Sequence, residues 1–576
     1  KQTEVRWGIA DFRRRFGREP EGMWLPETAV DIETLEVLAE EGIRFTIVAP
    51  YQVVAPPPGG RPGLCRLAGG KSIALFIYRG EASHAVAFGG ALHDGIAWGR
   101  ALAEAAESLN APPVHGAGPT TAPHHPTPRT AAPTLEHLVA IATDGETYGH
   151  HHKFGEMALA RALDELQAQG IRVENFGSFL ARNPAVQDVE LVEPTSWSCA
   201  HGVGRWKENC GCRVDVQRNP SQEWRAPLRV GLEALATALH AVYEREAIRL
   251  IPDPWDARDE YGAVVSTDPM TIERFVHTVA TGAHNEDDLV RARELLELER
   301  DALRMFTSCG WFFDDIAGIE PRQNLRYAAR AVMLAGPAAA AAEAAFLHTL
   351  ALAHSNDRSA GTGQEIYLKY ARPVFPAAMR HAAAAVAARY LAPDERRRYT
   401  SASVTIDDDW VRVNERRTGR RHDYRWRIVS QSVTDIVVEL LDSGGGAHIL
   451  RLADLPERPR LAIRAVLRKA MLPRCLSRDE LEQLTSGQAT MAGLLRVALI
   501  RAIERLDVEE DPETLRLALD IVDVFEQFEA RIPFDAQSAF WRIWINATAS
   551  RQAELQLLHH RLGFASDLPQ ADGASE

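Results

Sequence analysis

The sequence predicts an α/β protein whose N-terminal part contains a parallel sheet, and three observations indicate this fold class. Short apolar runs alternate with amphipathic helical patterns within about thirty residues, as in a parallel βα unit. Two of these runs are followed directly by a carboxylate. Long alanine- and leucine-rich helical patterns begin near Arg225, and alternating patterns follow Arg396. We therefore expect an α/β domain at 1–224, an α-helical domain at 225–395 and a C-terminal domain of strands and then helices at 396–576.

The elements of the α/β region are predicted from apolar periodicity and from the residues that end each pattern. The expected strands are Met23–Leu25, Phe45–Ala49, Ile73–Tyr78 and Leu138–Ala142, and the expected helices are Glu4–Phe16, Ile32–Ala39, Ile96–Leu109 and Met157–Leu166. Gly42 stands where a left-handed C-terminal cap is needed. The Pro- and Thr-rich stretch 112–133 has no apolar period and is predicted to be an exposed loop. Strands are expected within 401–413 and 428–441, and helices within 456–562.

Composition and charge narrow the class of protein. Hydrophobic residues make up 46% and charged residues 25% of 576 residues, which is ordinary for a globular chain. The net charge of -14 disfavours a nucleic acid partner, because phosphates repel it. The apolar stretch 328–353 is interrupted by Arg330, Gly336 and Glu343, so it falls short of the roughly 18 apolar residues of a membrane span. Six cysteines and no signal segment favour a cytoplasmic protein, and the oligomeric state stays open.

Glu27 and Asp144 are the candidate catalytic acids. Glu27 follows Trp24, and aromatic rings beside an acid are typical of sugar sites, because rings stack on C–H faces while carboxylates bind hydroxyls. Asp144 ends its expected strand, where an α/β barrel presents catalytic side chains, and Glu146 follows closely. Each acid has a simpler alternative. Glu27 could open the next helix, and Asp144 could be a helix N-cap.

Two kinds of chemistry are compatible with these acids. Two carboxylates facing each other across a sugar fit glycoside hydrolysis, with a separation of about 5 to 5.5 Å for retention and about 6.5 to 9.5 Å for inversion. Alternatively, Asp144 with His150 and His152 could hold a zinc ion that activates water, as in a deacetylase. The sequence alone leaves both open.

Two motifs carry a resemblance to a known family. W-L-P-E at Trp24–Glu27 and T-D-G-E-T-Y-G-H-H at Thr143–His151 resemble the third and fourth signature regions of glycoside hydrolase family 57, which contains retaining α-glucan-active enzymes. The resemblance implies that Glu27 is the nucleophile and Asp144 the general acid/base. It also implies a distorted (β/α)7-type barrel, an α-glucan or maltooligosaccharide substrate and no cofactor.

A third block, Ser196–Trp206, is similar to a later substrate-binding region in one branch of that family. That branch carries a long additional C-terminal domain of uncharacterised function, which Phe306–Leu325 resembles. The substrate-binding residues expected from the motifs are Trp24, Glu146, Tyr148, His150, Trp197, His201 and Trp206. For Trp206, core packing is an equal alternative, because large aromatics often stabilise cores.

The chain departs from the family pattern at its beginning. The family's first signature, a His-Gln-Pro-like segment on the first barrel strand, should come well before W-L-P-E, yet only 23 residues precede Trp24. The barrel is therefore expected to be N-terminally incomplete, with an open sheet edge. Either the chain is a fragment or another segment substitutes for this strand.

Cys199, His201, Cys210 and Cys212 form a C-x-H-x8-C-x-C cluster. Its spacing is not that of a standard zinc finger or ribbon, so we expect no metal and instead reduced thiols packed under a substrate loop, with a structural metal as the alternative.

The leading hypothesis is a retaining α-glucan hydrolase, 4-α-glucanotransferase or branching-type transglycosylase. The alternatives are a metal-dependent hydrolase like the polysaccharide deacetylases, and a non-catalytic glucan-binding protein, which the missing first signature favours.

Overall fold

A computed structural model describes residues 1–109, 136–391, 401–431, 435–508, 511–527 and 531–564 of the chain. The chain divides into two compact units, Lys1–Arg372 and Pro373–Glu576. The loop predicted at 112–133 lies outside the described residues. The domain boundaries predicted at 224/225 and 395/396 stay predictions.

The sheet of the first unit has three strands in the order β1-β3-β2. Their bounds are β1 Phe45–Val48, β2 Gly63–Arg66 and β3 Ser72–Ile77. β1 and β3 are parallel, and β2 is antiparallel to β3. All four side chains of β1 are buried, which fits its apolar run. Parallel pairing and flanking helices confirm the α/β class, but the described residues of this region contain no further strand, so a closed seven-stranded barrel is not confirmed.

The segments Met23–Leu25 and Leu138–Ala142, which were expected to be strands, are extended but do not pair as strands. Met23 N donates to the Phe45 carbonyl at 3.1 Å, but the ladder stops after the single parallel bridge between Gly22 and Phe45. Pro26, which has no N–H, then begins a 3-10 turn. The segment 138–142 meets the end of β3 where Arg79 N donates to the Ala140 carbonyl at 2.8 Å. Both segments therefore lie beside the sheet without joining it as strands.

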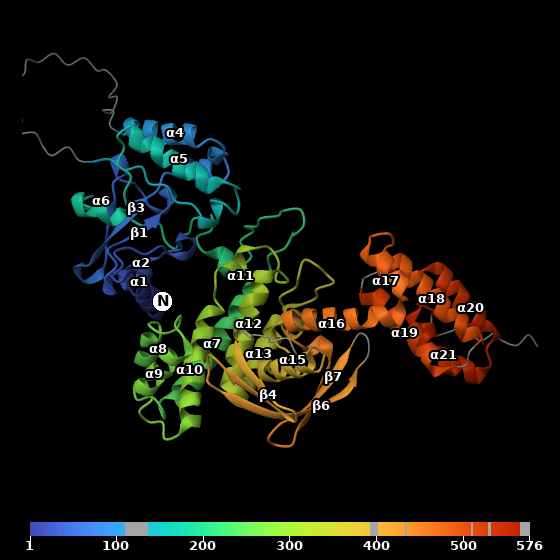
Figure 1. Cartoon of the computed structure of the whole chain (residues 1–576). Coiled ribbons are helices and arrows are strands. Elements are labelled where there is room, and N and C mark those ends of the chain that lie inside the picture. Colours follow the sequence, from blue (N-terminus) through green and yellow to red (C-terminus); the bar gives the residue numbers. More distant parts are fainter. Residues whose placement is uncertain (110–135, 392–400, 432–434, 509–510, 528–530, 565–576) are drawn as a thin grey trace, which may run out of the picture. The chain divides into compact units, whose positions relative to one another are not determined.

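Helices accompany this sheet along the chain. They are α1 Gln2–Phe16, α2 Ile32–Glu40, α3 Gly80–Ala87, α4 Gly95–Ser108, α5 Gly155–Ala168 and α6 Phe176–Arg182. The helices predicted from periodicity are thus confirmed within one or two residues at most ends. α4 and α5 lie side by side (Figure 1), and a Cβ on Gly95 would stand 2.6 Å from the Ala158 carbonyl. Glycine at this position allows the close approach of the two helices.

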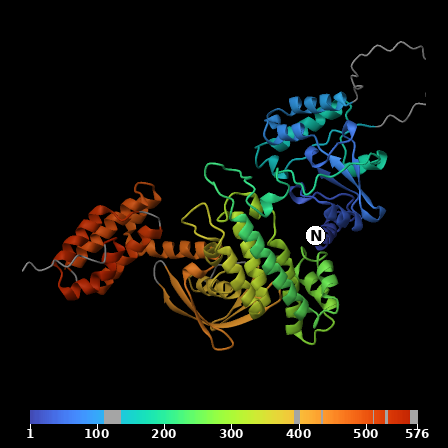
Figure 2. The ribbon, with the colours of Figure 1, turned by 180° about the vertical axis from the view of Figure 1, so that it is seen from behind.

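From Arg225 onward the first unit is largely helical, as predicted (Figures 1 and 2). Its helices are α7 Arg225–Ala247, α8 Pro254–Tyr261, α9 Pro269–Val279, α10 Glu286–Arg304, α11 Cys309–Phe312, α12 Ile319–Ala335, α13 Ala340–Leu350 and α14 Gly363–Ile366. The stretch Ile319–Leu350 contains an 18-residue window whose mean hydropathy, 1.3, is that of a membrane span. In the structure the 3-10 turn Gly336–Ala339 interrupts it, and both α12 and α13 pack against α7.

α1 is hydrogen-bonded to α8. Asp259 accepts a hydrogen bond from Thr3 at 2.6 Å and one from Arg6 at 2.7 Å, and the Trp7 indole donates to the Arg258 carbonyl at 3.0 Å. The α/β part and the helical part of the first unit therefore share one packed interface.

The second unit joins a meander of strands to a group of helices. The sheet is antiparallel in the order β4-β5-β6-β7-β8, and the alanine-rich helix α15, Ala377–Leu391, packs on it. The strands are β4 Ala402–Ile406, β5 Trp410–Glu415, β6 Arg421–Gln431, β7 Ile436–Leu441 and β8 Ala447–Leu450. The helices are α16 Glu457–Cys475, α17 Arg478–Thr485, α18 Met491–Val508, α19 Pro512–Gln527, α20 Phe534–Asn546 and α21 Ala549–Arg561. The predicted order of strands followed by helices is confirmed.

Candidate active site

Glu27 lies in the 3-10 turn Pro26–Thr28, directly after the extended segment beside β1. Its φ of 59° is in the left-handed region, which a glutamate rarely adopts. Buried hydrogen bonds hold this turn. Thr28 donates through Oγ1 to Gln52 Oε1 at 2.8 Å, and Gln52 Nε2 donates back to the Thr28 carbonyl at 2.9 Å. Such strain persists where the surroundings fix it, and it is common at active sites.

One oxygen of the Glu27 carboxylate accepts two hydrogen bonds. Oε2 receives Trp197 Nε1 at 3.0 Å and Ser198 Oγ at 2.7 Å. Trp197 N also donates to the Glu27 carbonyl at 3.0 Å. In the described part of the chain no donor reaches Oε1. The carboxylate is therefore held through one oxygen, and the other is available to a ligand.

Glu27 does not open the next helix. The N-cap of α2 is Asp31, whose carboxylate accepts from Thr34 N at 2.8 Å. The helix-start alternative for Glu27 is therefore wrong.

Aromatic side chains surround the donors to Glu27. Trp24 is 41% exposed, and its ring meets Trp197 edge-on at 5.1 Å. Tyr78 approaches Trp197 from another side at 6.3 Å, and the Tyr51 hydroxyl donates to the Trp197 carbonyl. Burial, with a smaller contribution from Tyr51, raises the pKa of Tyr78 to about 12. The site thus presents a neutral aromatic wall beside a carboxylate, which is the pairing that sugars require.

Asp144 is exposed and directly precedes the 3-10 turn Gly145–Thr147. Its side chain makes no capping hydrogen bond to that turn, so the N-cap alternative is not formed. Ala142, two residues earlier, packs against the same apolar cluster as Trp197, a donor to Glu27. Ala142, which directly precedes one motif, and Trp197, which holds Glu27, therefore contact one apolar cluster on a face of the sheet, and Asp144 itself is exposed. Glu146 is exposed in the turn beside it.

The histidines after Asp144 do not form the zinc site of the deacetylase alternative. His150 is exposed and its ring meets that of His151 at 5.4 Å, whereas His152 Nε2 lies 3.0 Å from the Ala87 carbonyl oxygen. Among the residues that the structure describes, the one group of three or more potential ligands that lies close enough to share an ion is the cysteine and histidine cluster near Trp197.

The other predicted substrate residues fall into different surroundings. Tyr148 is partly buried and stacks on Trp98 at 6.5 Å. His201 is exposed near the cysteines. Trp206 is buried and its indole donates to the Ser308 carbonyl at 3.1 Å. A sugar cannot stack on a ring that the core covers, so the substrate role predicted for Trp206 is wrong and the alternative of core packing is correct.

Three residues that were not among the predicted site residues lie near Glu27 or support its donors. Ser198 is a direct partner of Glu27. Partial desolvation raises the pKa of the thiol of Cys309, whose side chain is otherwise exposed, and the charge of Glu27 raises it further, so Cys309 lies within Coulombic range of the carboxylate. Asp314, which is buried, accepts from Val214 N at 2.7 Å and from Asp215 N at 2.6 Å. The helical part therefore supports the loop that supplies the donors.

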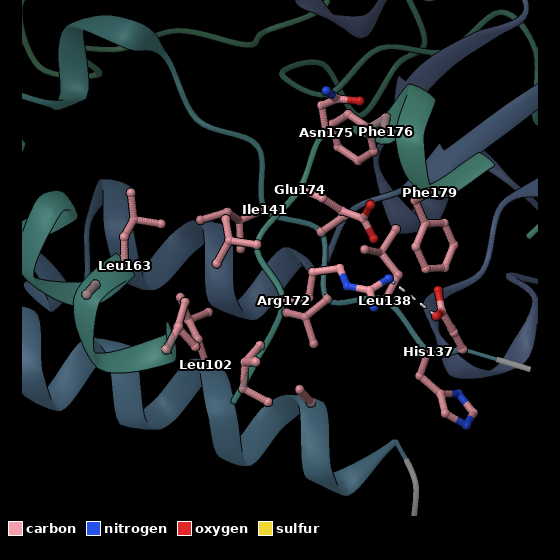
Figure 3. A pocket seen from close by; sticks show the side chains of 18 of the residues that line it. Leu102, His137, Leu138, Ile141, Leu163, Arg172, Glu174, Asn175, Phe176 and Phe179 are labelled. Atoms are coloured by element: carbon pink, nitrogen blue, oxygen red, sulfur yellow. Dashed lines mark ion pairs between the residues drawn. The ribbon is translucent and has the colours of Figure 1, made fainter. Parts of the chain in front are cut away.

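A cavity of about 590 Å³ lies elsewhere, between α4, α5 and the segments 136–141 and 171–176. Figure 3 shows Leu102, Ile141 and Leu163 around it. Arg172 and Glu136, which also line the cavity, form an ion pair at 3.6 Å. Neither Glu27 nor Asp144 lines it. Its lining is largely apolar and does not contain the carboxylate pair, so this cavity is not the candidate active site.

Comparisons with known proteins agree with the motif resemblance. Residues 2–188 match the family described as glycosyl hydrolase family 57, and residues 221–435 match a domain of unknown function (DUF3536). No curated protein matches the chain.

Three solved structures are similar to the chain. A GH57-type branching enzyme from Pyrococcus horikoshii is 16% identical over 61% of this chain and 59% of its own, with a TM-score of 0.33. A 4-α-glucanotransferase from Thermococcus litoralis is 12% identical over 77% and 50%, with a TM-score of 0.31. The α-amylase AmyC from Thermotoga maritima is 12% identical over 65% and 69%, with a TM-score of 0.37. The chain thus spans about three fifths of the length of the branching enzyme.

Proposed function

We propose that the chain, whose residues 2–188 belong to glycosyl hydrolase family 57, acts on α-glucans as a retaining hydrolase or transglycosylase. The observation that carries the proposal is the arrangement of the Glu27 carboxylate. Two donors hold its Oε2 beside exposed Trp24, while no donor among the residues that the structure describes reaches Oε1. Maltooligosaccharide is the proposed substrate. A cytoplasmic location and the absence of nucleic acid and membrane partners belong to the same proposal.

Each residue has a role in a two-step mechanism. Glu27 Oε1 attacks the anomeric carbon and forms a glycosyl ester, while Asp144 gives a proton to the departing glycosidic oxygen. Asp144 then removes a proton from water or from an acceptor hydroxyl, whose oxygen displaces Glu27 from the anomeric carbon. Two displacements retain the configuration. Hydrolysis and transfer differ only in which acceptor reaches the ester.

The aromatic side chains beside Glu27 contribute to substrate binding and not to bond breaking. Trp24 offers an exposed ring on which the apolar face of a glucose unit can stack, and Trp197 supports it edge-on. The full (β/α)7 barrel of the family is the arrangement in which we expect Asp144 to face Glu27 across the sugar.

The proposal is tested with a chromogenic maltooligosaccharide and two isosteric variants, Glu27→Gln and Asp144→Asn. Loss of a nucleophile or a general acid is expected to lower kcat by about 10²–10⁴-fold. Asp188→Asn is the matched control, because this exposed carboxylate only pairs with Arg66 on the surface. Equal turnover by all four proteins would exclude the site assignment.

The same experiment separates the alternative functions. Maltooligosaccharide binding by wild type, measured calorimetrically, without product release would indicate a non-catalytic glucan-binding protein. Acetate release from an acetylated oligosaccharide, with no cleavage of glycosidic bonds, would indicate a deacetylase.

A further inference from the structure

A cluster of three thiols and one imidazole lies directly after the two side chains that hold Glu27. Cys199 Sγ is 3.8 Å from Cys210 Sγ and 3.8 Å from Cys212 Sγ. Cys212 Sγ is 3.5 Å from His201 Nδ1. All four atoms lie within 4.8 Å of one another. Folding therefore brings the four potential ligand atoms of the C-x-H-x8-C-x-C motif close together.

These separations are those of a tetrahedral zinc site. Bonds of about 2.3 Å to sulfur and about 2.0 Å to nitrogen give tetrahedral edges of about 3.8 Å between sulfurs and about 3.5 Å between sulfur and nitrogen. A disulfide requires about 2.05 Å between sulfurs, and all three cysteines are free. Apolar packing alone would not direct three sulfurs and a ring nitrogen toward one centre.

The surroundings of the cluster also suit a metal thiolate. Backbone N–H groups of His201 and Arg205 donate to the Cys199 sulfur, which is buried. Arg225 Nη1 donates to the Cys212 carbonyl at 2.8 Å. Hydrogen bonds from backbone N–H groups stabilise anionic sulfur and orient metal ligands. The Cys199 sulfur therefore has outer partners, and the backbone of Cys212 is held in place by Arg225.

We propose that Cys199, His201, Cys210 and Cys212 bind one structural zinc ion. Three thiolates and one imidazole form a closed Cys₃His set, which leaves no open position for a substrate or a catalytic water. Binding is coupled to release of the thiol protons into solution. The proposal replaces the expectation, drawn from the irregular spacing, that the thiols carry no metal.

The zinc ion would fix the loop that positions Glu27. Ser198 and Trp197, its donors, directly precede Cys199, and the chain after Cys212 is held by Asp314. The loop between contains only the 3-10 turn Gly204–Trp206. A metal crosslink would therefore reduce the conformational freedom of the donors, and this consequence, unlike metal binding itself, rests on the proposed function.

Metal content of the full chain tests the proposal without any assay of activity. Protein purified without chelator is analysed by native mass spectrometry and elemental analysis, for wild type, Cys212→Ser and the double variant Cys210→Ser/Cys212→Ser. Cys309→Ser, an exposed cysteine outside the cluster, is the matched control. Wild type and control should carry one zinc per chain, whereas the double variant should retain less than about one tenth, because it loses two of the four ligands.

A second measurement covers the case in which the variants fail to fold. Wild type stripped of metal is titrated with Co²⁺, and thiolate-to-metal charge transfer with the visible bands of tetrahedral cobalt should saturate at one equivalent. Absence of zinc together with absence of these bands would overturn the proposal, and so would full zinc retention by the folded double variant. If the protein contains zinc but does not cleave glycosidic bonds, only the proposed function is contradicted. If it cleaves glycosidic bonds but binds no zinc, only the proposed metal site is contradicted.

Discussion

Replacement of Ser198 by alanine removes one of the two hydrogen bonds that hold the Glu27 carboxylate. Ser198 Oγ donates to Oε2 at 2.7 Å, and Trp197 Nε1 donates to the same atom at 3.0 Å. Without the hydroxyl, the carboxylate rotates more freely about its remaining donor. We expect a lower kcat with little change in KM, because the lost interaction orients the nucleophile and does not touch the rest of the sugar.

The magnitude follows from the type of bond. A hydrogen bond to a charged acceptor contributes about 1.5–3 kcal/mol, and the lower end applies because Glu27 is only partly buried and water can replace the hydroxyl. Since about 1.4 kcal/mol corresponds to a factor of ten, kcat should fall about 10-fold. Trp197→Phe should act similarly. The double variant should lose less than the product of the single losses, because both donors share one oxygen.

The assay is the initial rate of aryl maltooligosaccharide cleavage across a range of substrate concentrations. Ser108→Ala is the matched control, because the Ser108 hydroxyl only bonds to a carbonyl within α4. If Ser198→Ala keeps the wild-type kcat, or if it changes KM alone, the hydrogen bonds to Oε2 do not orient a nucleophile and the reasoning fails.

Three further predictions concern packing, binding and pH. Gly22→Ala should destabilise the first unit by about 1–3 kcal/mol in urea unfolding, because the added Cβ would stand 2.2 Å from the Phe45 ring; unchanged stability would contradict the packing of this segment. Trp24→Ala should raise KM about 5-fold with kcat retained, since stacking contributes about 1 kcal/mol; a loss confined to kcat would contradict a binding role. The hydrogen bond from His448 lowers the pKa of Asp442, so its stabilisation is present above the unfolded value of 3.8 and is lost as pH falls through the folded pKa. Asp442→Asn should therefore flatten the acid limb of a stability-against-pH curve, and an unchanged limb would show that this pair does not contribute.

Local patterns predicted the helices and the two parallel strands well. Periodicity and end signals located α2 and α5, because a helix that faces a core must repeat its apolar residues every turn. β2, Gly63–Arg66, was not predicted, because its sequence has no apolar run and its antiparallel pairing to β3 is a tertiary contact. The segment 138–142 was apolar enough for a strand, but pairing partners decide whether a segment joins a sheet.

In the candidate site, too, the sequence predicted some residues, whereas others could be identified only from contacts in the folded structure. Glu27 and Trp197 lie in recognisable motifs, whereas the role of Ser198 depends on contact with a residue 171 positions away. The four residues that we propose as zinc ligands were visible in the sequence, but their irregular spacing favoured a cluster without metal. Only the distances between the folded side chains reverse that preference. Burial of Trp206 could not be read from its motif either, because neighbouring aromatic residues can face a ligand or the core.

The most direct test of the central claim is identification of the residue that carries the sugar. Asp144→Asn, which should form the glycosyl ester from an activated substrate but hydrolyse it slowly, is quenched with acid, digested and sequenced by mass spectrometry. We expect the mass of the transferred glycosyl group on Glu27. A glycosyl group on any other residue, or turnover that leaves Glu27 unmodified in every quenched sample, would contradict it.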